Sequence, residues 1–257
     1  MQRHRSTLLL LAALVPLGTH AQELAGSPGG WTGTGELGLA MARGNSRSES
    51  LNTRLRFARE DTQWKNSFGL SALRSRAEVS GDFDGDGVEE RRYETSANRY
   101  DVAGSTAYRF NERNHLSGTA RYEHDDFSSF DYQGTVALGY GRRFIDSERT
   151  KFSGEIGPGY RRARTALDGE VQSNLIGRAL VEFRHQLTDN TELSNTLLVE
   201  SGKDNTFAQN DLGVSVAMNE RFALKAGLQA RHNTEVEDAE TRRTDTLTTV
   251  NLVYTFR

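Results

Sequence analysis

The sharpest candidate for chemistry in this chain is an acidic, glycine-rich segment at residues 82–90, with the sequence DFDGDGVEE. Carboxylates at its first, third and fifth positions, followed by glycine, match the start of an EF-hand-type calcium loop, in which Ca²⁺ takes several oxygen ligands on a tightly turned backbone. Tyr93 occupies the twelfth position, where such a loop has a bidentate Glu. A weak calcium site is one interpretation, and a solvated acidic loop is the other. The predicted calcium ligands are Asp82, Asp84, Asp86 and Glu90.

A second group of charged residues recurs at every second position along segments of alternating polarity. Inside a barrel, an excess of basic side chains could select small anionic solutes. Alternatively, paired charges could simply fill a narrow barrel. The side chains predicted to line the lumen are Arg54, Arg56, Arg109, Arg121, Glu123, Arg143, Glu155, Arg161, Arg178, Glu182, Arg184, Lys225 and Arg231, joined by Glu36, Lys65, Glu192, Glu200 and Asp211.

Enzymatic chemistry has weaker support in the sequence. A lipid-modifying barrel hydrolase would need a serine, a histidine and an orienting group at one lipid-facing rim. His124, His185 and His232 fall on the outward parity, but no distinctive serine motif accompanies them, and neither G-x-S-x-G nor H-E-x-x-H occurs. We therefore predict a non-enzymatic protein, with the barrel hydrolase as the alternative.

The elements that would position these residues are period-two strands, which run from Trp31 to the C-terminus. In the last of them, Val250, Leu252, Tyr254 and Phe256 share one parity, and the exceptions are Leu247 and Val253. A soluble sandwich would bury the apolar parity in a core, but only 35% of the 257 residues are hydrophobic and the mean hydropathy is −0.65. A barrel in a bilayer instead shows its apolar parity to lipid and keeps polar side chains inside.

The connections between the segments favour the same architecture. Short polar turns, such as residues 60–62 and 219–221, alternate with longer charged loops. This is the asymmetry of outer-membrane barrels, which have short periplasmic turns and long outer loops, whereas a soluble β-sandwich predicts the alternation alone. Aromatic residues also gather near strand ends, as interfacial girdles require. We predict an all-β, transmembrane, up-and-down antiparallel β-barrel of about twelve strands over residues 31–257.

The first residues resemble a secretory signal. Arg3 and Arg5 precede an apolar run from Thr7 to Leu17, and Thr19-His20-Ala21 is a small-x-small cleavage site. The apolar run is too short for a membrane anchor helix, which needs about 20 residues. We predict a signal peptide at residues 1–21, a linker at 22–30 and a bacterial outer-membrane location, since barrels are the other structure that can span a membrane.

Composition excludes several classes of function. Cysteine is absent, so the chain has no disulfide framework, no thiolate metal site and no cysteine nucleophile. The chain has 35 acidic and 32 basic residues, and cleavage would remove Arg3 and Arg5 from the basic side. A net negative charge argues against nucleic-acid binding. The expected partners are outer-membrane lipid, the barrel-assembly machinery during insertion and a small anionic solute, and the one cofactor considered is Ca²⁺.

The opening of the barrel segment resembles a known family. Trp31-Thr32-Gly33-Thr34-Gly35-Glu36-Leu37-Gly38, followed by Arg43-Gly44-Asn45-Ser46, is similar to the start of the salt-induced outer-membrane protein family. Strand ends such as Ala107-Tyr108-Arg109-Phe110 and the terminal Tyr254-Thr255-Phe256 are similar as well. The resemblance covers essentially the whole mature chain. It implies an outer-membrane barrel of unassigned activity, associated with salt or envelope stress, and it is compatible with a structural protein or a narrow passive channel.

Overall fold

The computed structural model describes residues 30–42, 47–235 and 243–256. The predicted signal peptide and most of the linker lie outside the described residues. Among those described, no helix is long and apolar enough to cross a membrane. The strands are β1 (Trp31–Ala42), β2 (Ser48–Glu60), β3 (Trp64–Gly81), β4 (Glu90–Arg109), β5 (Asn114–Asp125), β6 (Phe130–Asp146), β7 (Thr150–Thr165), β8 (Val171–Thr188), β9 (Thr191–Gly202), β10 (Thr206–Ala217), β11 (Phe222–Asn233) and β12 (Thr244–Phe256).

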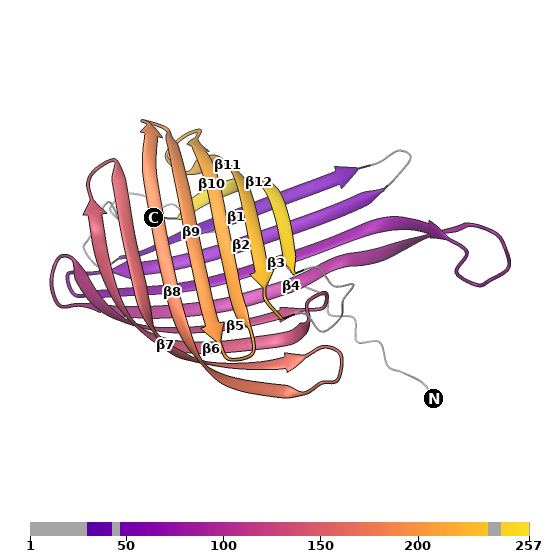
Figure 1. The fold of residues 1–257 in the computed structure, drawn as a ribbon. Coiled ribbons are helices and arrows are strands. Elements are labelled where there is room, and N and C mark those ends of the chain that lie inside the picture. Colours follow the sequence, from indigo (N-terminus) through magenta and orange to yellow (C-terminus); the bar gives the residue numbers. More distant parts are fainter. Residues whose placement is uncertain (1–29, 43–46, 236–242, 257) are drawn as a thin grey trace.

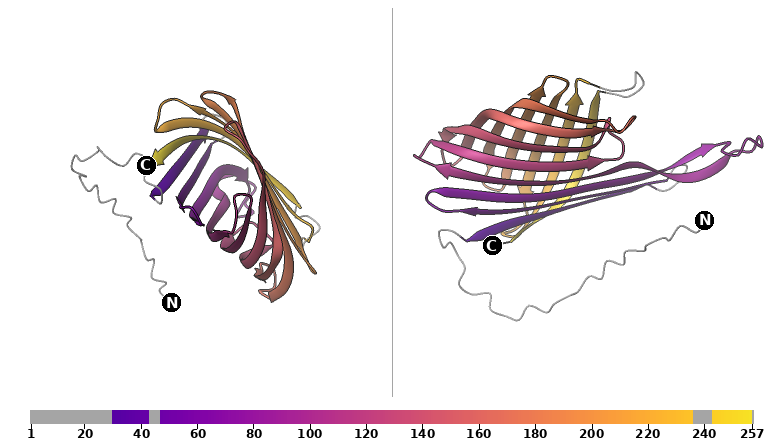
Figure 2. Two further views of the ribbon diagram at one scale, coloured as in Figure 1. Left: turned by 90° about the vertical axis from the view of Figure 1, so that its left-hand side faces the viewer. Right: turned by 90° about the horizontal axis from the view of Figure 1, so that it is seen from below.

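These strands form one closed barrel (Figure 1). Each strand pairs antiparallel with the next in sequence, and β12 pairs with β1 to close the wall. In the right-hand view of Figure 2, β1–β4 run along one direction while β9–β12 cross behind them at a steep angle. The predicted up-and-down barrel of about twelve strands is therefore confirmed.

The wall is inverted relative to that of a soluble protein. Large apolar side chains face outward, so that Leu175 is 79% and Ile156 67% exposed. On the opposite parity several charged side chains are buried, and Glu200 is only 1% exposed. This follows from the period of two, which sends successive side chains to opposite faces of the sheet. The interior of the barrel, which is its core, is accordingly polar.

The two ends of the barrel differ. The turn side is the end where β1 begins, β12 ends and residues 61–63, 110–113, 147–149, 189–190 and 218–221 connect the strands, and the opposite end is the loop side. The predicted contrast in connection length is weaker than expected, because the loop-side connection between β9 and β10 is only residues 203–205. On the loop side, long strands rather than long loops extend beyond the rest of the barrel. The β3–β4 hairpin projects beyond the rest of the wall (Figure 1), and its loop is only residues 82–89.

Aromatic rings gather around the turn side. Trp64 and Tyr108 lie 5.1 Å apart between ring centroids, Phe144 and Phe152 5.4 Å, and Phe222 and Tyr254 5.0 Å. All six belong to the turn-side ends of their strands. Such a girdle suits the interface between hydrocarbon and water, where rings with an apolar body and a polar edge are favoured.

The backbones of β6 and β7 approach each other closely near Gly157. Pairing runs from Ala137↔Gly159 to Tyr140↔Ile156, with no paired residues between these two positions. A Cβ atom on Gly157 would collide with the backbone carbonyl oxygen of Leu138, which cannot move without breaking the strand. Glycine is therefore required at position 157 for the two backbones to approach this closely.

Candidate functional site

A cavity of about 420 Å³ lies in the barrel interior near the turn side, and we call it the turn-side cavity. Side chains from β1–β4 and β8–β12 line it. Its volume lies in the range of small-molecule sites. Basic residues outnumber acidic ones on its walls. The charged lining residues are Arg54, Arg56, Arg99, Arg184 and Lys225 on the basic side, and Glu36, Glu192 and Asp211 on the acidic side.

The charges of the turn-side cavity are only partly paired. Lys225 Nζ lies 2.9 Å from Glu36 Oε1, and Arg54 Nη2 lies 3.9 Å from Asp211 Oδ1. Among the described residues, the guanidinium groups of Arg56 and Arg184 have no ion pair or hydrogen bond. Both side chains are exposed although they lie inside the barrel, so their donors face the open space of the cavity.

One wall of the turn-side cavity is apolar. Leu73 of β3 and Leu247 and Val253 of β12 line it together with the charged groups. Leu247 and Val253 are the two residues that break the alternation of the last strand in the sequence. Their inward position explains the exception, since they give the cavity an apolar surface beside its arginines.

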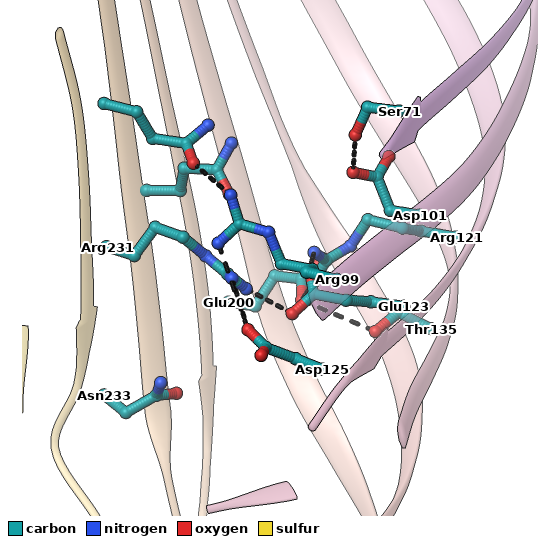
Figure 3. A network of polar contacts seen from close by, with 12 residues as sticks. Ser71, Arg99, Asp101, Arg121, Glu123, Asp125, Thr135, Glu200, Arg231 and Asn233 are labelled. Atoms are coloured by element: carbon teal, nitrogen blue, oxygen red, sulfur yellow. Dashed lines mark hydrogen bonds and ion pairs between the residues drawn. The ribbon is translucent and has the colours of Figure 1, made fainter. Parts of the chain in front are cut away.

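The loop-side interior is occupied by a group that we call the ion-pair cluster: Arg121, Glu123, Glu200, Arg231 and Phe207. Arg121 donates to Glu200 at 2.9 Å and to Glu123 at 3.0 Å, and Arg231 pairs with Glu123. Figure 3 shows Arg121 and Glu123 of β5 meeting Glu200 of β9 and Arg231 of β11, three strands that are not neighbours in the wall. Their contacts therefore cross the barrel interior.

Phe207 lies at the centre of the ion-pair cluster. Its side chain is fully buried, and the Cζ atoms of Arg121 and Arg231 lie 4.9 and 5.2 Å from its ring centroid, one cation–π contact each. Phe207 is not among the predicted lumen residues, because that prediction rested on charged side chains alone. The signal was present, since Phe207 has the inward parity of Asp211 on the same strand.

Further contacts extend the ion-pair cluster in both directions, to Asp125 at the loop side and to Arg99 at the turn-side cavity. Arg231 Nη1 lies 3.3 Å from Asp125 Oδ2, and Arg99 Nη2 donates to Gln229 Oε1 at 2.7 Å (Figure 3). Arg99 and Gln229 also line the turn-side cavity, so the same contacts form its loop-side boundary. At the loop side, the buried Arg161 donates to the backbone carbonyl of Asn205 at 3.2 Å.

The other predicted lumen residues lie around a smaller cavity of about 240 Å³ beneath β3–β8. Arg178 Nη1 lies 2.6 Å from Glu155 Oε1, and His115 Nε2 lies 3.5 Å from Glu155 Oε2. His115 was not predicted, although it shares the inward parity of Arg121. The remaining predicted residues that line this cavity are Lys65, Arg109, Arg143 and Glu182.

The acidic loop forms the turn that its sequence predicts. The carboxylates of Asp82, Asp84 and Asp86 place one oxygen each within 4.8 Å of one another. Gly85 and Gly87 have φ angles of 79° and 85°, which favour glycine. The backbone N–H groups of Gly87 and Gly85 donate to Asp82, and these bonds hold the pKa of that carboxyl below its usual value.

Glu90, the predicted fourth ligand, lies apart from the three grouped carboxylates. Glu90 is the first residue of β4 and pairs with Gly81, and it does not belong to the acidic group of the loop. Its Oε2 accepts a hydrogen bond from Arg92 Nη2 at 3.0 Å. Because β3 and β4 continue up to the loop, they hold Glu90 in the hairpin ladder.

The three outward histidines have separate surroundings. His124 Nε2 lies 2.8 Å from Asp126 Oδ1, and its ring packs on Tyr100. His185 bonds the hydroxyl of Thr150 at 2.8 Å, and His232 bonds that of Thr244 at 2.9 Å. None of these contacts, within the part of the chain that is described, supplies a serine to a histidine–carboxylate pair.

Comparison with known proteins gives matches in sequence and in fold. A family profile described as "Protein of unknown function, DUF481" matches residues 35–256. The uncharacterized protein YdiY of Escherichia coli K12 is 28% identical over 161 residues, and the chain spans 63% of that relative, using 63% of its own length. An outer-membrane channel from Pseudomonas putida F1 is similar with a TM-score of 0.49 at 13% identity, over 93% of this chain and 99% of that one. The translocator domain of the autotransporter NalP from Neisseria meningitidis has a TM-score of 0.46 at 12% identity, over 88% and 87%.

Proposed function

We propose, from the premise that the chain belongs to the DUF481 family of proteins of unknown function, that it is a non-enzymatic integral β-barrel of the bacterial outer membrane. In that membrane it provides a narrow passive path for small anionic solutes. The observation that carries this proposal is the inverted wall, apolar outside and charged inside. A barrel with such an exterior would expose its apolar side chains to water anywhere but in a bilayer.

The aromatic girdle supports the membrane placement and its orientation. Rings of Trp, Tyr and Phe surround the turn side at one level. In outer-membrane barrels the short turns face the periplasm. We therefore place the turn-side cavity at the periplasmic end and the ion-pair cluster toward the cell exterior.

The preference for anions rests on the turn-side cavity. Its basic residues exceed its acidic ones, and Arg56 and Arg184 have free donors that point into open space. A guanidinium group offers five N–H donors in a planar fork that matches a carboxylate or phosphate. A small anion passing the cavity would find these donors available without breaking an ion pair.

The proposed path is narrow because the ion-pair cluster fills the interior above the cavity. Glu123, Glu200 and Phe207 are buried, so little open space remains between their side chains for a solute. We expect a low conductance in planar bilayers, with a reversal potential in a salt gradient that favours the anion. Purified protein that carries no current above that of empty bilayers, or that favours cations, would contradict the proposed path.

Heat-modifiable gel mobility after detergent extraction tests the membrane barrel separately from conduction. A folded barrel migrates differently before and after boiling. A mature protein that is soluble without detergent would overturn the membrane placement itself.

Phe207→Ala tests whether the ion-pair cluster restricts conduction. The change removes the ring between two arginines, so we expect conductance to rise while heat-modifiable mobility is kept. Phe207→Val is a milder variant, in case the alanine variant does not fold. An unchanged conductance in a folded variant would mean that the restriction lies elsewhere.

The association with salt stress, the outer-membrane lipid and assembly-machinery partners, and the absence of catalysis belong to the proposal as expectations. A deletion strain should grow poorly at high salt and recover with the wild-type gene. Its lipid profile should be normal. Altered lipid turnover that His124→Ala, His185→Ala or His232→Ala reproduces would favour the barrel hydrolase instead.

A further inference from the structure

The closing seam of the barrel is shorter than the strands that form it. β1 pairs with β12 only over five positions, from Gly33↔Phe256 to Leu37↔Leu252. β1 continues to Ala42 and stays paired with β2 along its whole length, and β12 begins at Thr244 and stays paired with β11. Among the described residues, the facing edges of β1 and β12 are therefore unpaired on the loop side of Leu37 and Leu252.

This gap lies beside apolar surface. Leu39 and Met41 on β1 and Val250 on β12 are exposed on the outer face, above the last paired position. The apolar exterior thus continues along both borders of the gap. Within hydrocarbon, each backbone N–H or C=O group without a partner costs several kcal/mol. Irregular backbone at bilayer depth is tolerated where it is buried in protein or lines a water-filled cavity.

The turn-side cavity extends behind the unpaired part of β12. Leu247 and Thr249 line the cavity and belong to the unpaired part of β12. Arg56 lies at the paired level, opposite Thr34, and Arg184 lies on the far wall in β8. From the gap inward, the cavity therefore presents an apolar surface first and two free guanidinium groups deeper, toward the turn side.

We propose that the gap between β1 and β12 is a lateral opening through which a single-chain amphiphile with an anionic head occupies the turn-side cavity. The head is held by Arg56 and Arg184, and the chain lies against Leu247 and Val253 and leaves through the gap into the bilayer. This inference rests on the membrane placement proposed above, but it does not require that solutes cross the barrel.

Introduced cysteine pairs test the gap, since the chain has no cysteine of its own. The reference pair is Leu37→Cys with Leu252→Cys, which are paired in the ladder. The test pair is Met41→Cys with Thr248→Cys, which would face each other if the same register continued. A disulfide requires Cα atoms within about 7 Å. We expect the reference pair to oxidise and the test pair to stay reduced in nanodiscs. Equal oxidation of both pairs would show a closed wall and overturn the lateral opening.

Binding is tested with spin-labelled dodecanoate in nanodiscs of zwitterionic lipid. Electron paramagnetic resonance distinguishes the immobilised probe from the mobile probe in lipid. We expect an immobilised component with wild type that weakens about tenfold or more in affinity with Arg56→Gln/Arg184→Gln, since bonds to charged groups are removed. The matched control is Arg59→Gln/Arg142→Gln, which removes two exposed arginines outside the cavity lining. Spin-labelled dodecanol, which has no charged head, should not distinguish the two double variants.

The outcomes separate this inference from the proposed path. Immobilised dodecanoate that survives Arg56→Gln/Arg184→Gln overturns the inference, whatever the conductance. Anion conductance without any arginine-dependent binding also overturns the inference while the proposed path stands. Arginine-dependent binding in a barrel that carries no current supports the inference and contradicts the path. Heat-modifiable mobility of every variant confirms that it is folded.

Discussion

The ion-pair cluster and the turn-side cavity contain the same types of charged residue on the same inward parity. The arginines of the cluster are paired with carboxylates, whereas those of the cavity are only partly paired. Arg121 has carboxylates of Glu123 and Glu200 within 3.0 Å, whereas Arg56 has no ion pair among the described residues. Both side chains point into the barrel, Arg121 from β5 and Arg56 from β2. Parity therefore decides which face a side chain takes, while the distance across the barrel decides whether its charge is neutralised.

The partners in the ion-pair cluster come from distant parts of the chain. Arg121 and Glu200 are separated by 79 residues, and Arg231 and Glu123 by 108. At this level the walls are near enough for side chains to meet. Around the turn-side cavity, Arg56 and Arg184 reach no carboxylate among the described residues, and their side chains end in open space. One part of the interior thus serves stability, and the other is available for a ligand.

The largest expected effect is the loss of a buried carboxylate from the ion-pair cluster. Glu123→Ala leaves Arg231 and Arg121 without this partner in a buried environment. Removing one member of a buried ion pair costs about 3–5 kcal/mol. We expect the denaturant midpoint of the purified barrel in detergent to fall accordingly. The control is Glu60→Gln, whose partner Arg109 lies near the surface, with an expected cost of about 0–1 kcal/mol. Equal effects of the two variants would erase the contrast between packed and hollow regions.

A smaller loss of stability is expected at the close approach of β6 and β7. Gly157→Ala places a methyl group against the carbonyl oxygen of Leu138, and relief requires the strands to separate. Forcing extra atoms into a packed site costs about 1–3 kcal/mol. Gly177→Ala is the matched control, because nothing lies within 4 Å of the added Cβ atom there. If both variants unfold at the same denaturant concentration, the close approach at Gly157 does not contribute to the stability of the barrel.

The sequence predicted the wall well, because each strand carries its own signal. The number of strands, their order along the chain and the inward parity follow from the period of two and the turns between segments. The family membership also confirms the resemblance that the residues after Trp31 indicated. Even the exceptions were informative, since Leu247 and Val253 proved to be apolar side chains of the cavity.

The sequence could not predict which interior charges meet. Pairing across a barrel depends on its cross-section, and no local pattern encodes the approach of Glu200 to Arg121 or the position of Phe207 between two arginines. The incomplete seam was hidden for the same reason. The alternation of β1 continues up to Met41, although its pairing with β12 ends at Leu37. The place of Glu90 in the β3–β4 ladder was not predicted, because the sequence did not show how far that ladder extends.

The smallest expected effect concerns the acidic loop, where charges are neither paired as in the ion-pair cluster nor enclosed as in the cavity. Asp82, Asp84 and Asp86 are exposed and mutually close, so Ca²⁺ would relieve their repulsion. The calcium site stays a prediction, with an affinity of about 10⁻⁴–10⁻³ M, as in extracellular modules. Calorimetric titration of the detergent-solubilised barrel at millimolar calcium should give a binding heat that Asp84→Ala/Asp86→Ala abolishes.

Two controls make this last prediction specific. Glu90→Ala should leave the binding heat unchanged, because Glu90 is held in the ladder and pairs with Arg92. Acid should abolish binding only at low pH, since the N–H groups of Gly87 and Gly85 lower the pKa of Asp82. A lowered pKa keeps the carboxylate ionised until the pH falls through that lowered value, and the proton then displaces the cation. A wild-type titration indistinguishable from that of the double variant would leave the segment an acidic surface loop, whose three charges are simply solvated.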